Sequence, residues 1–151
     1  MSTCYVMLIV SEKVFLDTAP FIYWLENHPV YYPKIDQYIT QLIGDNARLI
    51  TSVLTYLEYC VKPEELGRQD LIDDFIALTT DLHCPLTPIT IDITTKAYQL
   101  RAVHKSLKAM DALQLATAVV NNCQTFVTND KRLQGVTDID VVIIDDIELS
   151  K

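Results

Sequence analysis

Apolar residues in this chain fall into two patterns. In some places they form short uninterrupted runs, such as Val14-Phe15-Leu16, which predict strands buried on both faces of a sheet. In others they recur every three or four residues, as between Tyr32 and Ile43, which predicts amphipathic helices. The predicted strands cover residues 14–16, 48–52, 85–89, 125–128 and 141–144. The predicted helices cover residues 19–26, 32–43, 53–63, 66–78, 92–103 and 111–120, with Asp92 as the N-cap of the fifth.

Strands and helices alternate along the chain, and this order predicts a mostly parallel central sheet with right-handed crossovers. Helices should cover both faces of the sheet, which gives a three-layer α/β/α domain. The chain has 151 residues, half of them apolar, and this suits one domain with a sizeable core. We assign residues 13–146 to that domain, residues 1–12 to an N-terminal extension or edge strand, and residues 147–151 to a C-terminal tail. The apolar run within the first ten residues is too short to span a bilayer and lacks a basic leader.

The charge balance narrows the classes of function. Twelve basic and twenty acidic residues give a formal net charge of −8, which argues against a protein that grips nucleic acid by bulk positive charge. Any contact with nucleic acid should therefore be local or assisted by metal. The four cysteines form no C-x-x-C pair, so the sequence predicts neither a zinc site nor a disulfide framework. Reduced thiols of this kind favour a cytoplasmic protein.

Four carboxylates stand at positions that the predicted fold brings together. Asp17 and Asp130 directly follow strands, Glu58 lies about two turns into the helix after the second strand, and Asp111 begins a buried helix. In a parallel sheet the strands end at one edge, so all four side chains can converge there. Taken singly, Asp111 and Asp130 could be capping residues and Asp17 an ordinary loop residue.

Four converging carboxylates would repel one another and raise their pKa values unless a cation offset the charge. Histidine and thiolate are missing from the set, and a site made of oxygen ligands alone suits Mg²⁺ or Mn²⁺. The sequence therefore predicts a divalent metal site at the carboxyl edge of the sheet.

The same residues resemble a known family, the PIN domains, and within it the VapC-type toxins. The matching segments are residues 15–18, 57–58, 110–118 and 126–130, and their order covers most of the chain from Lys13 to about Ile144. The resemblance implies a PIN-like fold with endoribonuclease activity, in which Asp17, Glu58, Asp111 and Asp130 bind one or two divalent ions. It also implies a VapBC-type toxin that forms a homodimer and is restrained by a small antitoxin.

Other polar side chains are expected to support this chemistry. Thr18 adjoins the first acid, and Thr128 and Asn129 match the polar pair that, by resemblance, orients the fourth acid or a water. The candidates for guiding the RNA backbone are basic residues at helical spacing or beside the fourth acid, namely Arg101, Lys105, Lys108, Lys131 and Arg132.

Two rival functions are compatible with the sequence. The first is a catalytically inactive PIN-like binding module that contacts protein or RNA through a surface containing Tyr23, Trp24, Tyr31 and Tyr32, although such aromatic residues are more often core. The second is a phosphoacceptor or phosphatase domain that uses Asp17. It is weaker because no second Asp lies two residues on and no glycine-rich phosphate loop follows.

Overall fold

A five-stranded sheet forms the centre of the computed structural model, which describes residues 11–151. The sheet consists of β1 (Lys13–Leu16), β2 (Arg48–Ser52), β3 (Leu86–Thr87), β4 (Thr125–Thr128) and β5 (Asp140–Ile143). The strand order is β3-β2-β1-β4-β5, and every neighbouring pair is parallel. The predicted sheet is therefore confirmed, and within the described residues it contains no antiparallel pair.

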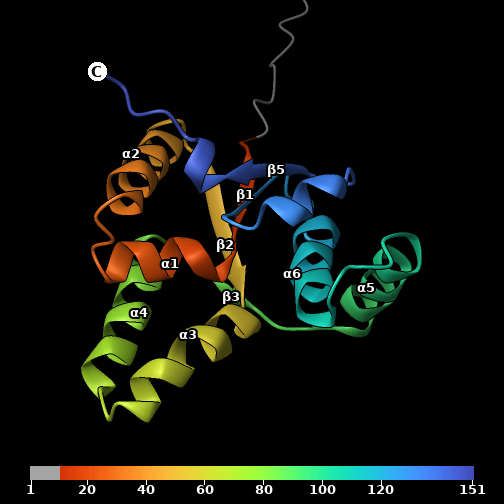
Figure 1. Ribbon diagram of the computed structural model, residues 1–151, viewed down its shortest axis with the longest axis horizontal. Coiled ribbons are helices and arrows are strands. Elements are labelled where there is room, and N and C mark those ends of the chain that lie inside the picture. The colour runs from red at the N-terminus through yellow and green to blue at the C-terminus, as the bar shows by residue number, and fades with distance from the viewer. Residues whose placement is uncertain (1–10) are drawn as a thin grey trace, which may run out of the picture.

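Helices cover both faces of the sheet (Figure 1). One side carries α1 (Thr18–Leu25), α2 (Tyr31–Gly44), α3 (Val53–Glu65) and α4 (Gln69–Asp81), and the other carries α5 (Ile91–Val103) and α6 (Ala109–Val120). Two 3₁₀ helices, η1 (Lys131–Gly135) and η2 (Ile144–Asp146), flank β5. The three-layer α/β/α architecture predicted from the sequence is confirmed.

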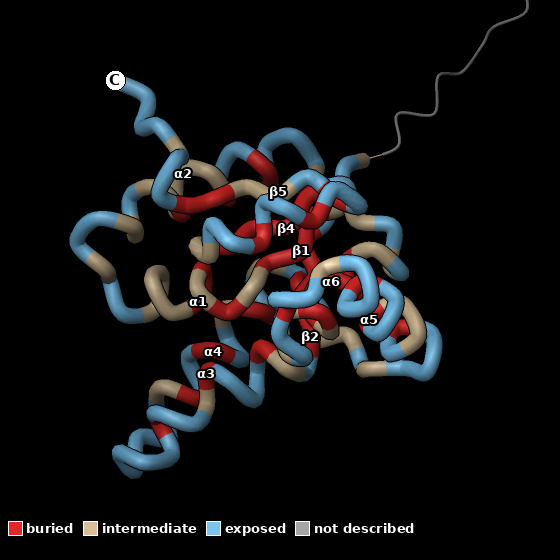
Figure 2. Tube along the Cα trace, turned by 45° about the vertical axis from the view of Figure 1, so that its right-hand side comes forward, coloured by how far each residue is buried: buried red, intermediate tan, exposed pale blue. Residues whose placement is uncertain are grey.

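The side chains of β1 show how the two faces are filled. Val14 and Leu16 point into the core beneath α1 to α4, whereas Phe15 points into the core beneath α5 and α6. All three are fully buried, as expected for a central strand of a parallel sheet. The ring of Phe15 stacks on Phe126 of the neighbouring β4 with centroids 5.1 Å apart. Figure 2 shows the buried sheet between more exposed helices, with the α3–α4 hairpin extending away from it.

The observed ends of the helices correct two local predictions. The N-cap of α5 is Thr90 and not Asp92, because the Thr90 hydroxyl accepts a hydrogen bond from the backbone N–H of Ile93 at 3.3 Å. Asp92 instead lies in the first turn, where its charge favours the helix dipole. The third helix runs to Glu65 and not only to Pro63; Pro63 lies in its last turn and lacks only its own backbone N–H donor.

The N-terminal extension or edge strand proposed for residues 1–12 falls mostly outside the described residues. Cys60, Cys84 and Cys123 are free thiols in the described part of the chain. Within residues 11–151, no helix has the length and apolar character needed to cross a membrane.

Candidate metal centre

The strand order places a crevice at the carboxyl edge of the sheet. From β1 the chain crosses to β2 on one side, and β4 lies on the other side of β1. Loops that leave two such neighbouring strands diverge to opposite faces, and the gap between them is the usual binding site of open α/β sheets. Asp17 follows β1 and Asp130 follows β4, so these two acids occupy the crevice.

A cavity of about 600 Å³ at this edge is lined by Asp17, Glu58, Asp111 and Asp130. The four acids come from the β1–α1 junction, α3, the first turn of α6 and the residue before η1. Glu58 is exposed at the rim, whereas Asp17, Asp111 and Asp130 are partly buried. Residues separated by more than a hundred positions in the sequence thus line one pocket.

Asp17 is the most strongly held of the four acids. Its Oδ1 accepts hydrogen bonds from the backbone N–H of Thr18 at 2.8 Å and from Nε2 of Gln114 at 3.4 Å. Its Oδ2 accepts a hydrogen bond from the hydroxyl of Thr128 at 2.8 Å. As the N-cap of α1, Asp17 lies where the helix dipole favours a negative charge. Both carboxylate oxygens are therefore fixed in direction.

Three of the acids carry unfavourable negative charge. Burial and the charge of Asp111 raise the pKa of Asp17 above the ordinary aspartate value. Desolvation and the charges of Asp17 and Asp111 raise the pKa of Glu58, and desolvation and the charge of Asp130 raise that of Asp111. Such mutual repulsion is the electrostatic condition that a bound cation relieves.

Asp130 is in a different state because a neighbouring arginine neutralises it. The guanidinium of Arg132 donates to Asp130 Oδ1 from Nε at 2.9 Å and to Oδ2 from the terminal nitrogen at 2.6 Å, which is a bidentate pair. The backbone N–H of Arg132 also donates to Oδ1 at 3.0 Å. These contacts hold the pKa of Asp130 below its usual value. Asp130 is therefore the one acid of the four with a lowered pKa, although its charge still acts on Asp111.

The donor set fits a divalent cation in kind, since it offers carboxylate and hydroxyl oxygens and an excess of negative charge. Among residues 11–151, however, no three carboxylate, imidazole or thiol groups are close enough together to ligate one ion as they stand. The hydrogen bonds explain this separation, because Asp17 is turned toward Thr128 and Asp130 toward Arg132. Asp17 and Asp130 would therefore exchange some of these hydrogen bonds for contacts to a bound ion.

A buried polar network beneath Asp17 was not predicted from the sequence. Gln114 of α6 is only 2% exposed and donates from Nε2 to the hydroxyl of Thr55 at 2.7 Å as well as to Asp17. Its Oε1 accepts a hydrogen bond from Ser52, and Thr55 bonds to Thr51 at 2.8 Å. The available signal was a single glutamine within the otherwise apolar run of residues 112–116.

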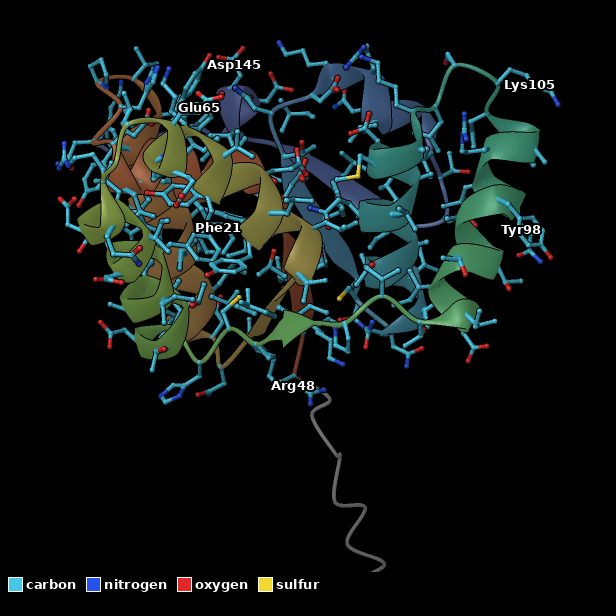
Figure 3. All side chains as sticks on the ribbon, turned by 90° about the horizontal axis from the view of Figure 1, so that it is seen from below. Phe21, Arg48, Glu65, Tyr98, Lys105 and Asp145 are labelled. Carbon is cyan, nitrogen blue, oxygen red and sulfur yellow. The ribbon has the colours of Figure 1, made fainter. Side chains whose placement is uncertain are left out.

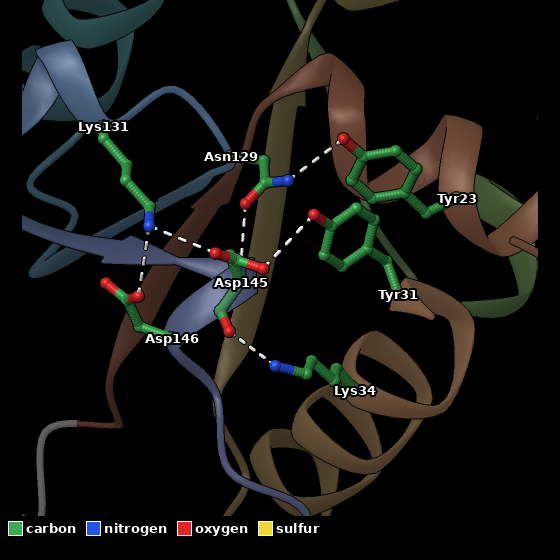
Figure 4. Close-up of polar contacts among 7 residues, drawn as sticks. All are labelled: Tyr23, Tyr31, Lys34, Asn129, Lys131, Asp145 and Asp146. Atoms are coloured by element: carbon green, nitrogen blue, oxygen red, sulfur yellow. Dashed lines mark hydrogen bonds and ion pairs between the residues drawn. The ribbon is translucent and has the colours of Figure 1, made fainter. Parts of the chain in front are cut away.

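The three polar residues expected to support the acids have different partners. Thr18 donates from its hydroxyl to Glu58 at 3.3 Å, and Thr128 bonds to Asp17 while its oxygen accepts from the backbone N–H of Asp130 at 3.2 Å. Asn129 also lines the acidic pocket, but its side chain bonds to residues outside the set of four acids, and these contacts are drawn in Figure 4. Its amide donates to the hydroxyl of Tyr23 at 3.1 Å and accepts from the backbone N–H of Asp145 at 2.9 Å. Asn129 thus ties α1 and η2 to the end of β4.

The five basic candidates are distributed unevenly around the crevice. Lys131 and Arg132 line the acidic pocket, but Lys131 pairs with Asp145 at 3.1 Å (Figure 4). Lys108 adjoins Asp111 at the start of α6. Arg101 donates from Nε to the backbone carbonyl of Leu107 at 3.1 Å and so fixes the loop before α6. Lys105 is exposed on that loop (Figure 3).

Comparison with known proteins gives three results. The family model of the PIN domain matches residues 14–139. No curated protein matches the chain. Among solved structures, the fold resembles VapBC2 from Rickettsia felis bound to a DNA fragment from their promoter, with a TM-score of 0.70 at 16% identity over 87% of this chain and 98% of that one.

Two further solved structures share the fold. A DNA-bound VapBC from Salmonella typhimurium gives a TM-score of 0.70 at 18% identity, covering 88% of this chain and 98% of that one. A toxin-antitoxin complex from Klebsiella pneumoniae gives a TM-score of 0.66 at 23% identity, covering 87% of this chain and 97% of that one. At these identities the likeness establishes the fold.

Proposed function

This chain belongs to the PIN domain family, and on that premise we propose that it is a metal-dependent endoribonuclease, the toxin of a VapBC-type toxin-antitoxin pair. The observation that carries the proposal is the single cavity lined by Asp17, Glu58, Asp111 and Asp130. Three of these carboxylates have raised pKa values, so the pocket has the charge of a cation site. The fold of the VapBC structures supports the assignment to a toxin.

In this scheme Asp17, Glu58 and Asp111 would hold Mg²⁺ or Mn²⁺, and Asp130 would complete the set if its carboxylate were released from Arg132. When bound, the ion supplies a positive charge that lowers the pKa of a water and stabilises charge on a phosphoryl oxygen. Thr128 and Gln114 orient the carboxylate of Asp17 through their hydrogen bonds. Thr18 does the same for Glu58. These side chains act on the acids and not on the RNA.

The basic residues near the pocket suit a phosphate backbone on an otherwise acidic protein. Lys108, Lys131 and Arg132 lie along the two sides of Asp111 and Asp130, where a phosphate could approach the acids without crossing the negative surface. Lys131 is held by Asp145 and Asp146, so it contributes less free positive charge than Lys108.

RNA cleavage tests the proposal directly. The wild-type protein should cleave single-stranded RNA with Mg²⁺ or Mn²⁺ and lose this activity in EDTA. Asp17→Asn and Asp111→Asn should each reduce cleavage by at least about a hundredfold while leaving the far-ultraviolet circular dichroism unchanged. Full activity in either variant, or equal activity in EDTA, would contradict the proposed site. Absence of cleavage across several RNAs, with binding retained, would favour the inactive binding module.

The partners follow from the same premise. We propose a small antitoxin and a second copy of the chain as protein partners, and a cytoplasmic location. Exposed apolar side chains at four-residue spacing on α3 support a protein contact there: Val53, Leu57 and Val61 are 39%, 56% and 50% exposed. Size-exclusion chromatography with light scattering measures the copy number, and a mass of one chain at micromolar concentration would contradict the dimer.

A further inference from the structure

A second, smaller cavity adjoins the acidic pocket. It has a volume of about 240 Å³ and lies between the loop that joins α5 to α6 and the 3₁₀ helix η1. Asp111 and Arg132 line both cavities, so the two are neighbours across these side chains. Because ligand pockets for drug-sized molecules measure roughly 300–1,000 Å³, a cavity of this size suits one small planar group.

The lining of the second cavity has two chemical parts. Leu107, Leu133 and Val136 are buried and give it an apolar floor. The rim carries His104, Ser106, Lys108, the carboxylate of Asp111 and the guanidinium of Arg132. Within residues 11–151 the ammonium of Lys108 has no hydrogen bond or ion pair with another side chain, although its charge acts on the nearby carboxylates of Asp111 and Asp130.

The loop that forms the rim is held in place by its own hydrogen bonds. The backbone N–H of Leu107 donates to the carbonyl of His104 at 3.0 Å, and Nε of Arg101 donates to the carbonyl of Leu107 at 3.1 Å. The carbonyl of Lys108 accepts from the backbone N–H of Ala112 at 2.9 Å as α6 begins. A cavity fixed in this way needs little reordering when a ligand binds.

We propose that this second cavity binds one unpaired nucleotide of the RNA substrate, next to the phosphate that is cleaved. The base would rest on Leu107, Leu133 and Val136, and the phosphate that joins it to the scissile position would contact Lys108 and Arg132. The inference rests on the proposed nuclease function and deepens it, since a base can enter only after leaving its stack. The substrate class is therefore single-stranded RNA with at least one splayed nucleotide at the cleavage position.

Nucleotide binding in EDTA tests this site without any cleavage. The probes are adenosine and uridine 5′-monophosphates, with adenosine and inorganic phosphate as separate arms, and the readout is the backbone amide NMR spectrum. We expect saturable shifts at Ser106, Leu107 and Gly135 with the monophosphates and weaker binding of adenosine or phosphate alone. Inorganic phosphate binding as tightly as the nucleotides would overturn the base-binding role. Amide shifts confined to residues away from the second cavity would overturn the proposed location of the site.

A pocket-filling variant with a matched control makes the test specific. A Cβ built at Gly135, on the wall of the cavity, meets no atom within 4 Å, and the same is true of Gly44 at the end of α2. Gly135→Leu should weaken nucleotide binding by at least about fivefold, the lower end of what one base contact contributes, whereas Gly44→Leu should not. Equal binding by the two variants would refute the assignment.

The charge on the rim is tested by a second pair of variants. Lys108→Gln should weaken binding of the monophosphates, and Arg48→Gln, which removes one positive charge at the opposite edge of the sheet (Figure 3), should leave it unchanged. RNA cleavage is measured in parallel. A Lys108→Gln protein that binds nucleotides weakly but cleaves RNA at the wild-type rate would overturn the role of this cavity in substrate binding alone. A wild-type protein that binds nucleotides but shows no metal-dependent cleavage would overturn the proposed function alone.

Discussion

Replacing Gln114 by leucine should destabilise the protein and impair the candidate site together. The two side chains are similar in size, so the change removes hydrogen bonds with little change in volume. Gln114 is 2% exposed and bonds to Ser52, Thr55 and Asp17. Among the described residues, no buried side-chain nitrogen or oxygen lacks a partner, so the wild-type network is fully satisfied.

The loss of unfolding free energy in Gln114→Leu depends on which hydrogen bonds the partners of Gln114 retain. Thr55 keeps its bond to Thr51, and Asp17 keeps its bonds to Thr18 and Thr128. Ser52 is buried and still accepts from the backbone N–H of Leu54, but its hydroxyl loses its acceptor. One buried donor without a partner costs about 1–3 kcal/mol of the free energy of unfolding.

Urea denaturation in EDTA measures this loss. With an m-value of about 1–3 kcal/mol per molar urea, the unfolding midpoint of the variant should fall by about 1 M. Gln99→Leu is the matched control, because Gln99 lies on the exposed face of α5 and a surface change of this kind shifts stability by less than about 0.5 kcal/mol. Gln114→Leu should also lower kcat for RNA more than it raises KM, since Asp17 loses one of the contacts that orient it. A Gln114→Leu protein as stable as the control would refute the role of the buried network.

Three further outcomes follow from the charges and the core. Burial raises the pKa of Asp17, so its contribution to stability is present at low pH and lost as the pH rises through the folded-state pKa. In EDTA at pH 7, Asp17→Asn should therefore unfold at a higher urea concentration than wild type, and this difference should shrink as the pH falls toward the ordinary aspartate pKa. A lower unfolding midpoint for the variant at pH 7 would contradict this. Arg132→Gln should free Asp130 and tighten Mn²⁺ binding severalfold by calorimetry, and unchanged affinity would show that the ion pair does not compete with metal. Phe126→Ala, which removes a fully buried ring from the stack with Phe15, should cost about 3–5 kcal/mol of unfolding free energy, and a loss under about 1 kcal/mol would contradict its place in the core.

The strands were the most predictable part of the fold. The predicted strands at residues 48–52 and 125–128 coincide with β2 and β4, because a central parallel strand must be apolar on both faces and its run is bounded by turn-forming residues. Helix starts were less certain from the sequence. Thr90 and Asp92 are both residues that cap helices, and only the backbone path decides that Thr90 does so. The 3₁₀ helices were not predicted, since such short turns depend on tertiary contacts.

The candidate site was predictable in its composition but not in its internal contacts. Sequence order alone placed four acids at one edge, because the ends of parallel strands meet there. The pairing of Asp130 with Arg132 is local, yet nothing in the sequence favours Asp130 over the three other acids as the partner of that arginine. The bond between Gln114 and Asp17 joins residues 97 positions apart and exists only in the folded chain.

These contacts change what the acidic pocket requires of a metal ion. An ion that enters must offset the repulsion among Asp17, Glu58 and Asp111, which favours binding, and must also draw Asp130 away from a bidentate arginine, which opposes it. The first effect comes from the three acids themselves, whereas the second comes from Arg132, two positions after Asp130. Metal affinity in this chain should therefore depend on Arg132 as well as on the carboxylates, and a released guanidinium would face the second cavity, where the phosphate of the bound nucleotide is proposed to lie.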